Sequence, residues 1–393
     1  MSDVSSMLCV LRKAFDAVHY SITLTIKLST MKRIIHFFIL LTVLVTGLIV
    51  NSFGQGCVAV RNMASCAMGF DSTQNNTWQF SANYRYFRSF RHFRGKEEEE
   101  ERVEQGTEVI NHDNSLLIGI NYTANKRFSF GLTIPYIYID RSSLYEHYGN
   151  TPGNPRFHTQ AQGIGDMRLT AYYAAVQNNR LNLLVGLGVK LPTGNFRTKD
   201  YFHKLDSEGQ DSLVYKVVDQ SIQLGDGGFG VIVEFDANYM FSKGFSAYAT
   251  GLYMSNPKNT NGVERSPSLT NGIPLSNEFS VCDQFLARLG ARYSVKRFNF
   301  ALGGRVEGIP SEDLIGDSDG FRRPGYIISV EPALGYIVGK HSFGLSLPIA
   351  LERNRTQNTI DKKRSEMTGE LVQGDAAFAD WLLSITYNYR LGK

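Results

Sequence analysis

The chain has 393 residues, enough for one large domain or barrel, and its formal net charge of +4 is too near balance to favour a nucleic-acid partner. Its 37 Gly, 20 Tyr and 25 Phe are a heavy load of turn-forming and strand-forming residues, which favours β-structure. A mean hydropathy of −0.20 gives no sign of a helical membrane protein. A membrane barrel is compatible with this value, because its polar lumen and loops dilute the lipid-facing residues.

The one long apolar run, residues 34–50, follows Lys32 and Arg33 and precedes small polar residues. A basic start, an apolar core and a small-residue exit are typical of a secretory signal peptide, so we expect one at 31–56. An inner-membrane anchor is the alternative, since 17 residues can just span a bilayer. Residues 1–30 then form an upstream extension to which we assign no function.

Four cysteines are present, and two of them lie near the expected mature N-terminus. In an exported protein Cys57 and Cys66 are disulfide candidates, although the sequence leaves their pairing open. Lipidation of Cys57 is less favoured, because no aliphatic residue precedes it in the pattern of a lipoprotein signal. Cys282 is expected to be an inert strand residue, and residues 57–77 a short periplasmic N-terminal segment.

From Trp78 onward the chain alternates apolar and polar residues in segments of about ten residues. A period of two indicates strands, and about ten tilted residues cross a bilayer as a strand. Twelve segments follow this pattern: 78–86, 114–124, 128–139, 167–173, 183–191, 229–239, 245–254, 284–293, 298–306, 326–337, 343–351 and 381–391.

Short turns and long polar loops alternate between these segments. Residues 78–393 are therefore predicted to be all-β, forming a transmembrane antiparallel up-and-down β-barrel of about 12 strands in the cell outer membrane. The short turns would be periplasmic and the long loops extracellular. Aromatic residues gather near the short-turn ends, which predicts a girdle at the membrane interface. Pro135, Pro332 and Pro348 fall inside predicted strands, so we expect bulges or displaced strand ends there.

Two glycine-rich stretches frame one predicted hairpin: Gly163-Ile-Gly-Asp-Met-Arg168 and Gly186-Leu-Gly-Val-Lys-Leu-Pro-Thr-Gly194. This hairpin resembles one that recurs in Gram-negative outer-membrane barrels, among them proteins associated with the meta-cleavage pathway of phenol degradation and the transporter group around them. The terminal run Leu383–Leu391 is similar to the C-terminal strand signal read by the barrel-assembly machinery. The resemblance implies a channel or transporter for small apolar or aromatic solutes, and it carries no binding residue over to this chain.

Charged residues on the polar faces of the strands are the candidate lumen-lining groups. Two readings stay open: a network of buried ion pairs, and a pore lining that selects solutes. The candidates are Arg85, Asp166, Arg168, Lys190, Glu234, Asp236, Arg288, Arg292, Arg305, Glu307, Glu331 and Arg390.

The other functional classes find less support. The acidic run Glu97–Glu101 is typical of a solvated external loop, with a bridging divalent ion as the alternative. Asp317-Ser-Asp319-Gly320 begins like a calcium loop, but Ile328 stands where the loop needs a glutamate. No metal or cofactor is therefore predicted.

No G-x-S-x-G motif is present, so an outer-membrane hydrolase is less favoured than a channel. A non-conducting structural or adhesion barrel remains the main alternative. The expected partners are outer-membrane lipid and lipopolysaccharide, the assembly machinery and a small solute.

Overall fold

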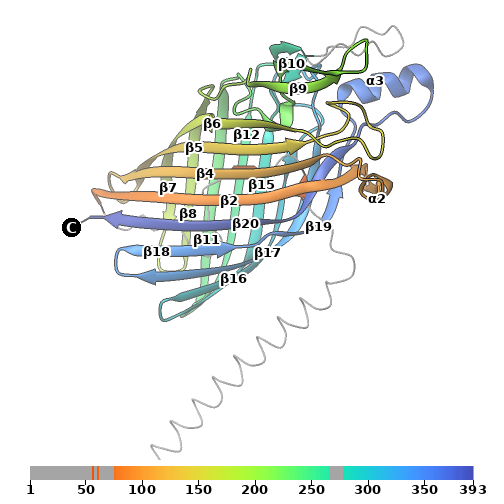
Figure 1. Cartoon of the computed structure of the whole chain (residues 1–393). Helices are drawn as coiled ribbons and strands as arrows, with labels where there is room; N and C mark the ends of the chain where they lie inside the picture. Colours follow the sequence, from red (N-terminus) through yellow and green to blue (C-terminus); the bar gives the residue numbers. More distant parts are fainter. Residues whose placement is uncertain (1–54, 57–59, 62–74, 265–277, 393) are drawn as a thin grey trace, which may run out of the picture. The chain divides into compact units, whose positions relative to one another are not determined.

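Twelve antiparallel segments of β-structure, here called staves, form the wall of the barrel (Figure 1). This computed structural model describes residues 55–56, 60–61, 75–264 and 278–392. Residues 53–393 form one compact unit. Ten staves are single strands. The other two are interrupted, so each of them consists of two labelled strands. The staves are β2 Thr77–Arg94, β4 Ile110–Thr123, β5 Phe128–Ser142, β6 His158–Ile164 with β7 Met167–Gln177, β8 Leu181–Leu191, β11 Gly230–Ser242, β12 Phe245–Ser255, β15 Gln284–Val295, β16 Phe298–Ile309, β17 Gly325–Val338, β18 His341–Ser346 with β19 Ile349–Asn354, and β20 Ala376–Leu391.

The sheet closes on itself because its first and last staves pair. β2 and β20 are antiparallel, from Trp78 opposite Leu391 to Phe93 opposite Ala376. Closure satisfies the backbone donors and acceptors that an open edge would leave unpaired, which a bilayer requires. The predicted fold class is confirmed.

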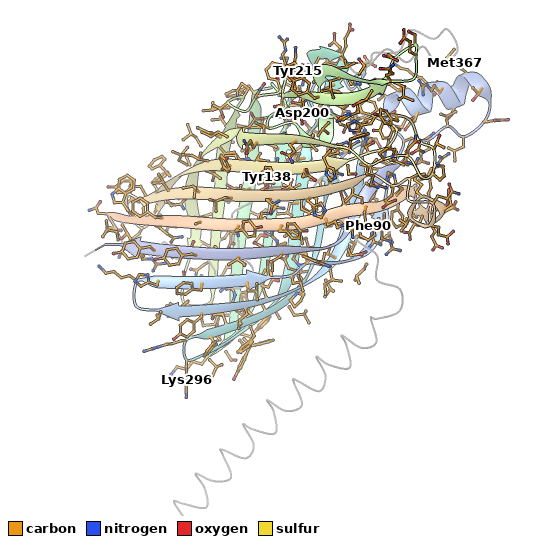
Figure 2. The ribbon with its side chains drawn as sticks, viewed as in Figure 1. Phe90, Tyr138, Asp200, Tyr215, Lys296 and Met367 are labelled. Atoms are coloured by element: carbon orange, nitrogen blue, oxygen red, sulfur yellow. The ribbon has the colours of Figure 1, made fainter. Side chains whose placement is uncertain are left out.

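The remaining elements lie at the end of the barrel that carries the long loops (Figure 1). They are β3 Glu97–Glu98, α2 Glu101–Glu104, β9 Lys199–Leu205, β10 Asp211–Val217, η1 Gln220–Ile222, β13 Thr260–Glu264, β14 Glu278–Ser280 and α3 Thr359–Thr368. β1, Gln55–Gly56, pairs with the start of β20. In Figure 2, Lys296 marks the turn between β15 and β16 at the opposite end from Tyr215 and Met367. No helix among the described residues is long and apolar enough to span a membrane.

Burial in the wall is the reverse of that in a water-soluble protein. Leu187 and Leu289 are 63% and 68% exposed, while Lys190 and Glu331 are each 2% exposed. Apolar side chains therefore face outward and charged ones inward. A band of exposed aliphatic residues is stable only against lipid, so the barrel spans a membrane.

Exposed aromatic rings cluster where the short turns are, as predicted. Rings from adjacent staves form cross-strand pairs, which stabilise the wall where it meets the interface. The centroid distances are 4.7 Å for Trp78–Tyr122, 5.2 Å for Phe128–Tyr173, 5.0 Å for Phe298–Tyr336 and 5.2 Å for Phe343–Tyr387. This arrangement is the expected girdle of amphipathic rings.

The three prolines coincide with interruptions of the ladder. Pro135 lies where β5 changes partner from β7 to β6, and its carbonyl accepts a hydrogen bond from the amide of Gly165. Pro332 faces the gap between β18 and β19, and Pro348 lies in that gap. The range 343–351, predicted as one strand, is therefore broken at 347–348, because a proline has no amide hydrogen for the ladder.

β12 turns its even-numbered residues inward. Tyr248 is 3% exposed and lies across β15 and β16. A Cβ added at Gly303 would lie 2.3 Å from the Tyr248 hydroxyl, and one at Gly290 would lie 2.6 Å from it. The two glycines thus make room for the tyrosine inside the barrel.

Candidate functional site: the barrel lumen

Three adjoining cavities follow the interior from the long-loop end to the short-turn end. The vestibule, of about 330 Å³, lies among the extracellular loops and is bordered by the end of β2 at His92 and the start of β20 at Ala377. The upper cavity, of about 160 Å³, lies below the segment around Gln220, and the lower cavity, of about 430 Å³, reaches Lys340 in a short turn.

Shared lining residues connect the three cavities. Arg323 borders both the vestibule and the upper cavity. Arg61, Thr133 and Arg168 border both the upper and the lower cavity. The cavities are therefore neighbours in series, and an arginine stands at each of the two junctions between them.

Seven of the twelve predicted lumen residues border the cavities. The upper cavity contacts Asp166, Arg168 and Lys190, and the lower cavity contacts Arg168, Glu234, Asp236, Arg292 and Arg390. Their side chains come from staves on several sides of the barrel. This distribution follows from the period of two, which turns every second side chain inward.

The other five predicted residues lie in the wall as a buried charged group. Arg85, Arg288, Arg305, Glu307 and Glu331 are all at most 5% exposed. Glu331 accepts from Arg288 Nε at 3.0 Å and lies 3.6 Å from Arg305, which also pairs with Glu307 at 2.8 Å. Arg288, Arg305, Glu307 and Glu331 therefore form a network of buried ion pairs. A solute-selecting lining remains a prediction for the seven residues that border cavities.

Val60 and Arg61 lie inside the barrel, within the segment 57–77 that the sequence assigned to a short periplasmic region. The Val60 amide donates to Glu307 at 2.7 Å, and its side chain packs against Ile232 and Leu286. Arg61 pairs with Asp113 on β4 at 3.2 Å. This dipeptide crosses the lumen between opposite walls, at the level where the upper and lower cavities meet.

Asp166 ties the interrupted wall to the loop that enters the lumen. Its carboxylate accepts from the amides of Gly194 at 2.9 Å and Asp226 at 3.1 Å. Lys190 pairs with Asp226 and lies 3.9 Å from Asp166. The glycine-rich hairpin found in the sequence therefore positions the loop of residues 220–226, which lines the upper cavity.

An ion-pair network surrounds Asp219 at the extracellular mouth. Arg323 donates to its two carboxylate oxygens at 2.9 and 2.8 Å, and Arg141 lies 3.8 Å away. Burial alone would raise the pKa of Asp219, but Arg323 and Arg141 hold that pKa well below its usual range. Asp219 therefore remains charged at neutral pH and fixes Arg323 at the junction.

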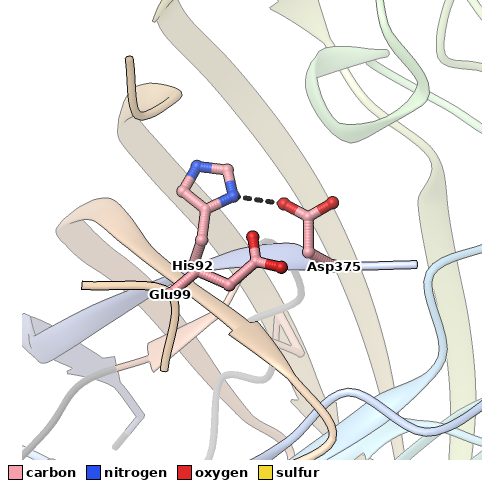
Figure 3. Close-up of side chains that lie close together, drawn as sticks. All are labelled: His92, Glu99 and Asp375. Atoms are coloured by element: carbon pink, nitrogen blue, oxygen red, sulfur yellow. Dashed lines mark hydrogen bonds and ion pairs between the residues drawn. The ribbon is translucent and has the colours of Figure 1, made fainter. Parts of the chain in front are cut away.

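His92, Glu99 and Asp375 bring potential metal-ligand atoms within 4.8 Å of one another at the rim (Figure 3). The Val109 amide donates to His92 Nε2 at 2.8 Å, so the neutral ring carries its proton on Nδ1 and donates it to Asp375 at 2.5 Å. If a metal bound Nδ1, the neutral ring would carry its proton on Nε2. Nε2 could then no longer accept the hydrogen bond from the Val109 amide.

The two carboxylates of this trio already have cationic partners. Arg102 pairs with Glu99 at 2.7 Å and with Asp375 at 3.1 Å. Burial raises the pKa of Asp375, but the His92 hydrogen bond and the Arg102 charge hold it well below its usual range. Together with Arg102, the trio forms a network of hydrogen bonds and ion pairs that links β2 to the residue just before β20.

The described histidines offer no hydrolytic triad. His158 pairs with Asp140 and His203 with Asp211, both in exposed positions, and His112 contacts the Tyr86 hydroxyl. None of the six histidines in the described ranges hydrogen-bonds a serine hydroxyl, the contact that activates a serine nucleophile.

The sequence analysis did not predict several charged residues of the lumen and its extracellular mouth. Asp113 lies one residue before the predicted strand, and extending the period of two backward by one step would have found it. Arg323 and Asp219 lie in loops, where no period marks a residue as inward.

Cys57 and Cys66 fall outside the described residues. Cys282 lies just before β15, not in a strand, and burial raises the pKa of its free thiol to about 11.

No family model matches the sequence, and no curated protein matches it. Among solved structures, the COG4313 outer membrane channel from Pseudomonas putida F1 is similar in fold, with a TM-score of 0.55, 12% identity, and coverage of 85% of this chain and 100% of that chain. The β domain of the Bordetella autotransporter BrkA has a TM-score of 0.42 and 12% identity, and the match covers 81% of this chain and 100% of that chain. The P. putida toluene transporter TodX has a TM-score of 0.39 and 10% identity, and the match covers 82% of this chain and 91% of that chain. We infer nothing about this protein from these two weaker similarities.

The closed sheet, the exposed apolar band and the aromatic girdle define a twelve-stranded β-barrel of the bacterial outer membrane.

Proposed function

We propose that this barrel is an outer-membrane channel for small organic solutes that carry an apolar or aromatic body. The observation that carries the proposal is the chain of three adjoining cavities, which runs from the extracellular loops to the periplasmic turns. A purely structural or adhesive barrel has no need of such a path. The similarity in fold to a solved outer-membrane channel supports the same class.

The lining supports an amphipathic solute. Phe87, Leu117, Ile137 and Met254 give the upper cavity apolar walls. Charged groups such as Arg168 stand beside them in the same cavity. Binding sites for small organic molecules combine apolar walls with a few placed polar groups in this way. The seven predicted residues that border the cavities are proposed to contact the solute.

Finer assignments from the sequence belong to the same proposal. Residues 31–56 would direct export, and residues 78–393 would then insert as the barrel. The C-terminal run within β20 would be recognised by the assembly machinery, and the outer band would contact lipid and lipopolysaccharide. The likeness of the glycine-rich hairpin to the phenol-degradation group supports aromatic solutes.

Vesicle swelling tests the proposal. Purified barrel is reconstituted into liposomes, which are then diluted into an isotonic solution of phenyl β-glucoside, an aromatic solute that a bare bilayer excludes. Entry of the glucoside draws water inward, so these liposomes should swell faster than protein-free liposomes or liposomes with heat-denatured protein. Equal swelling rates in all three preparations would overturn the channel function.

A further inference from the structure

We propose that the channel selects small organic anions, and that Arg168 binds the anionic group where the upper and lower cavities meet. This inference rests on the proposed channel function and deepens it by naming the charge of the solute. It follows from three observations on the lining.

The first observation is an excess of cations in every cavity. Among the described residues, five arginines and two carboxylates border the vestibule, and four cationic side chains and three carboxylates border the upper cavity. The lower cavity is bordered, within the same part of the chain, by five cationic side chains and two carboxylates. A lumen with one prevailing sign of charge focuses its field and concentrates counter-ions.

The second observation is the identity of the residues at the two junctions. The vestibule and the upper cavity share Arg323, and the upper and lower cavities share Arg61, Thr133 and Arg168. No carboxylate among the described residues borders two cavities. An anion that moves along the path would therefore pass from one guanidinium group to the next.

The third observation distinguishes Arg168 from the other arginines at the junctions. Arg323 is matched by Asp219, and Arg61 by Asp113. Arg168 Nη1 donates to the carbonyl oxygen of Arg61 at 2.5 Å, and no carboxylate oxygen of the described residues lies within 4.0 Å of its guanidinium nitrogens. One carbonyl uses one of the five N–H donors, and within the described ranges no second acceptor contacts this guanidinium, which leaves donors to bind a carboxylate or sulfonate.

The surroundings of Arg168 also fit an organic anion better than an inorganic one. The upper cavity brings Leu117, Ile137 and Leu224 to the same lumen level, where an apolar body would be removed from water. A carboxylate or sulfonate on an aromatic ring would place its charge at Arg168 and its ring against these side chains. The ligand class is therefore a small amphipathic anion.

The test measures the reversal potential of the purified barrel in a planar bilayer, under a gradient of sodium benzenesulfonate. We expect the aromatic anion to be several-fold more permeant than sodium. Arg168→Gln should bring the ratio of benzenesulfonate to sodium permeability close to one, and Arg168→Glu should make sodium the more permeant ion. Arg180→Glu makes the same change of charge in the exposed turn between β7 and β8, outside the lumen, and should leave the ratio unchanged.

Gel mobility before and after boiling verifies that each variant is a folded barrel, and Arg168→Gln carries the test if Arg168→Glu does not fold. Conductance that prefers sodium in the native protein would overturn the anion assignment while leaving the channel function intact. A ratio that Arg168→Gln leaves unchanged would overturn the role of Arg168. An absence of conductance from folded protein would overturn the channel function, and the inference with it.

Discussion

Nε of Arg288 on β15 lies 3.0 Å from a carboxylate oxygen of Glu331 on β17, and both side chains are almost fully withdrawn from solvent. The pair spans β16, whose Arg305 and Glu307 belong to the same network of buried ion pairs. A buried ion pair is costly to desolvate, so this wall of the lumen depends on every partner being present.

Removing the charge of Glu331 should therefore destabilise the barrel. Glu331→Gln leaves Arg288 and Arg305 with Glu307 as the remaining carboxylate of the group, and we expect a loss of about 3 kcal/mol in the free energy of unfolding. The measurement is reversible urea unfolding in lipid vesicles, followed by tryptophan fluorescence. The paired change Arg288→Met with Glu331→Leu removes both charges and should recover most of the loss; a single variant as stable as the native protein would contradict the role given to this pair.

Two adjacent glycines on β16 should respond differently to the same substitution. A Cβ at Gly303 would meet the Tyr248 hydroxyl at 2.3 Å and the Leu289 carbonyl at 2.6 Å, whereas one at Gly304 would meet nothing within 4 Å. Gly303→Ala should cost about 1–3 kcal/mol through overpacking, and Gly304→Ala should be close to neutral. Urea unfolding of the two variants side by side checks this, and equal effects would contradict the inward position of Tyr248.

The rim trio should not respond to transition metals. Because the Val109 amide occupies His92 Nε2 and Arg102 pairs with both carboxylates, zinc should leave the thermal unfolding temperature unchanged. His92→Ala should lower the free energy of unfolding by about 1–3 kcal/mol, since it leaves the Val109 amide without its acceptor. A rise of the unfolding temperature with zinc that His92→Ala abolishes would show that the trio binds metal.

Acid should loosen the extracellular hairpin β9–β10. The His203 amide donates to His147 Nδ1 at 3.1 Å, and the His147 ring packs against Phe202. Burial, helped by the nearby charges of His203, Lys204 and Lys216, lowers the pKa of His147 to about 4, from about 6.5 in an unfolded chain.

The sign of the pH effect follows from this lowered pKa. Between about pH 6.5 and pH 4, His147 is protonated in the unfolded state and neutral in the folded state. Its contribution to stability is therefore complete above about pH 6.5 and falls as the pH drops toward 4. Limited proteolysis should cut the loop between β9 and β10 faster at about pH 5 than at about pH 7. His147→Phe keeps an aromatic ring without the titrating group and should flatten this dependence; an unaltered dependence in that variant would assign the effect to another group.

The staves could be predicted from sequence because a barrel imposes one rule along its whole wall. The period of two that places Leu187 in lipid places Lys190 in the lumen, so the inward charges could be read off directly. The prolines were also informative, since Pro135, Pro332 and Pro348 all mark breaks in the ladder.

The lumen contents could not be predicted, because they come from segments without a period. Arg323 and Asp219 meet across more than a hundred residues of loop and strand, and Val60 reaches Glu307 from near the N-terminus. Such contacts depend on how loops fold into the lumen, where local propensity gives no guidance. The sequence could likewise show that Arg168 and Glu331 face inward, but not that one borders cavities and the other is buried in an ion-pair group.

Single-channel recording of the purified barrel in a planar bilayer tests most directly whether the lumen is a conducting path. A conducting lumen should give stepwise currents that fall sharply in Thr133→Trp, because the added ring fills the junction of the upper and lower cavities. Leu187→Trp adds the same ring to the lipid-facing surface and should conduct like the native protein. Folded native barrel that inserts without current would contradict a conducting lumen. A Thr133→Trp variant that conducts as well as Leu187→Trp would contradict a path through this junction.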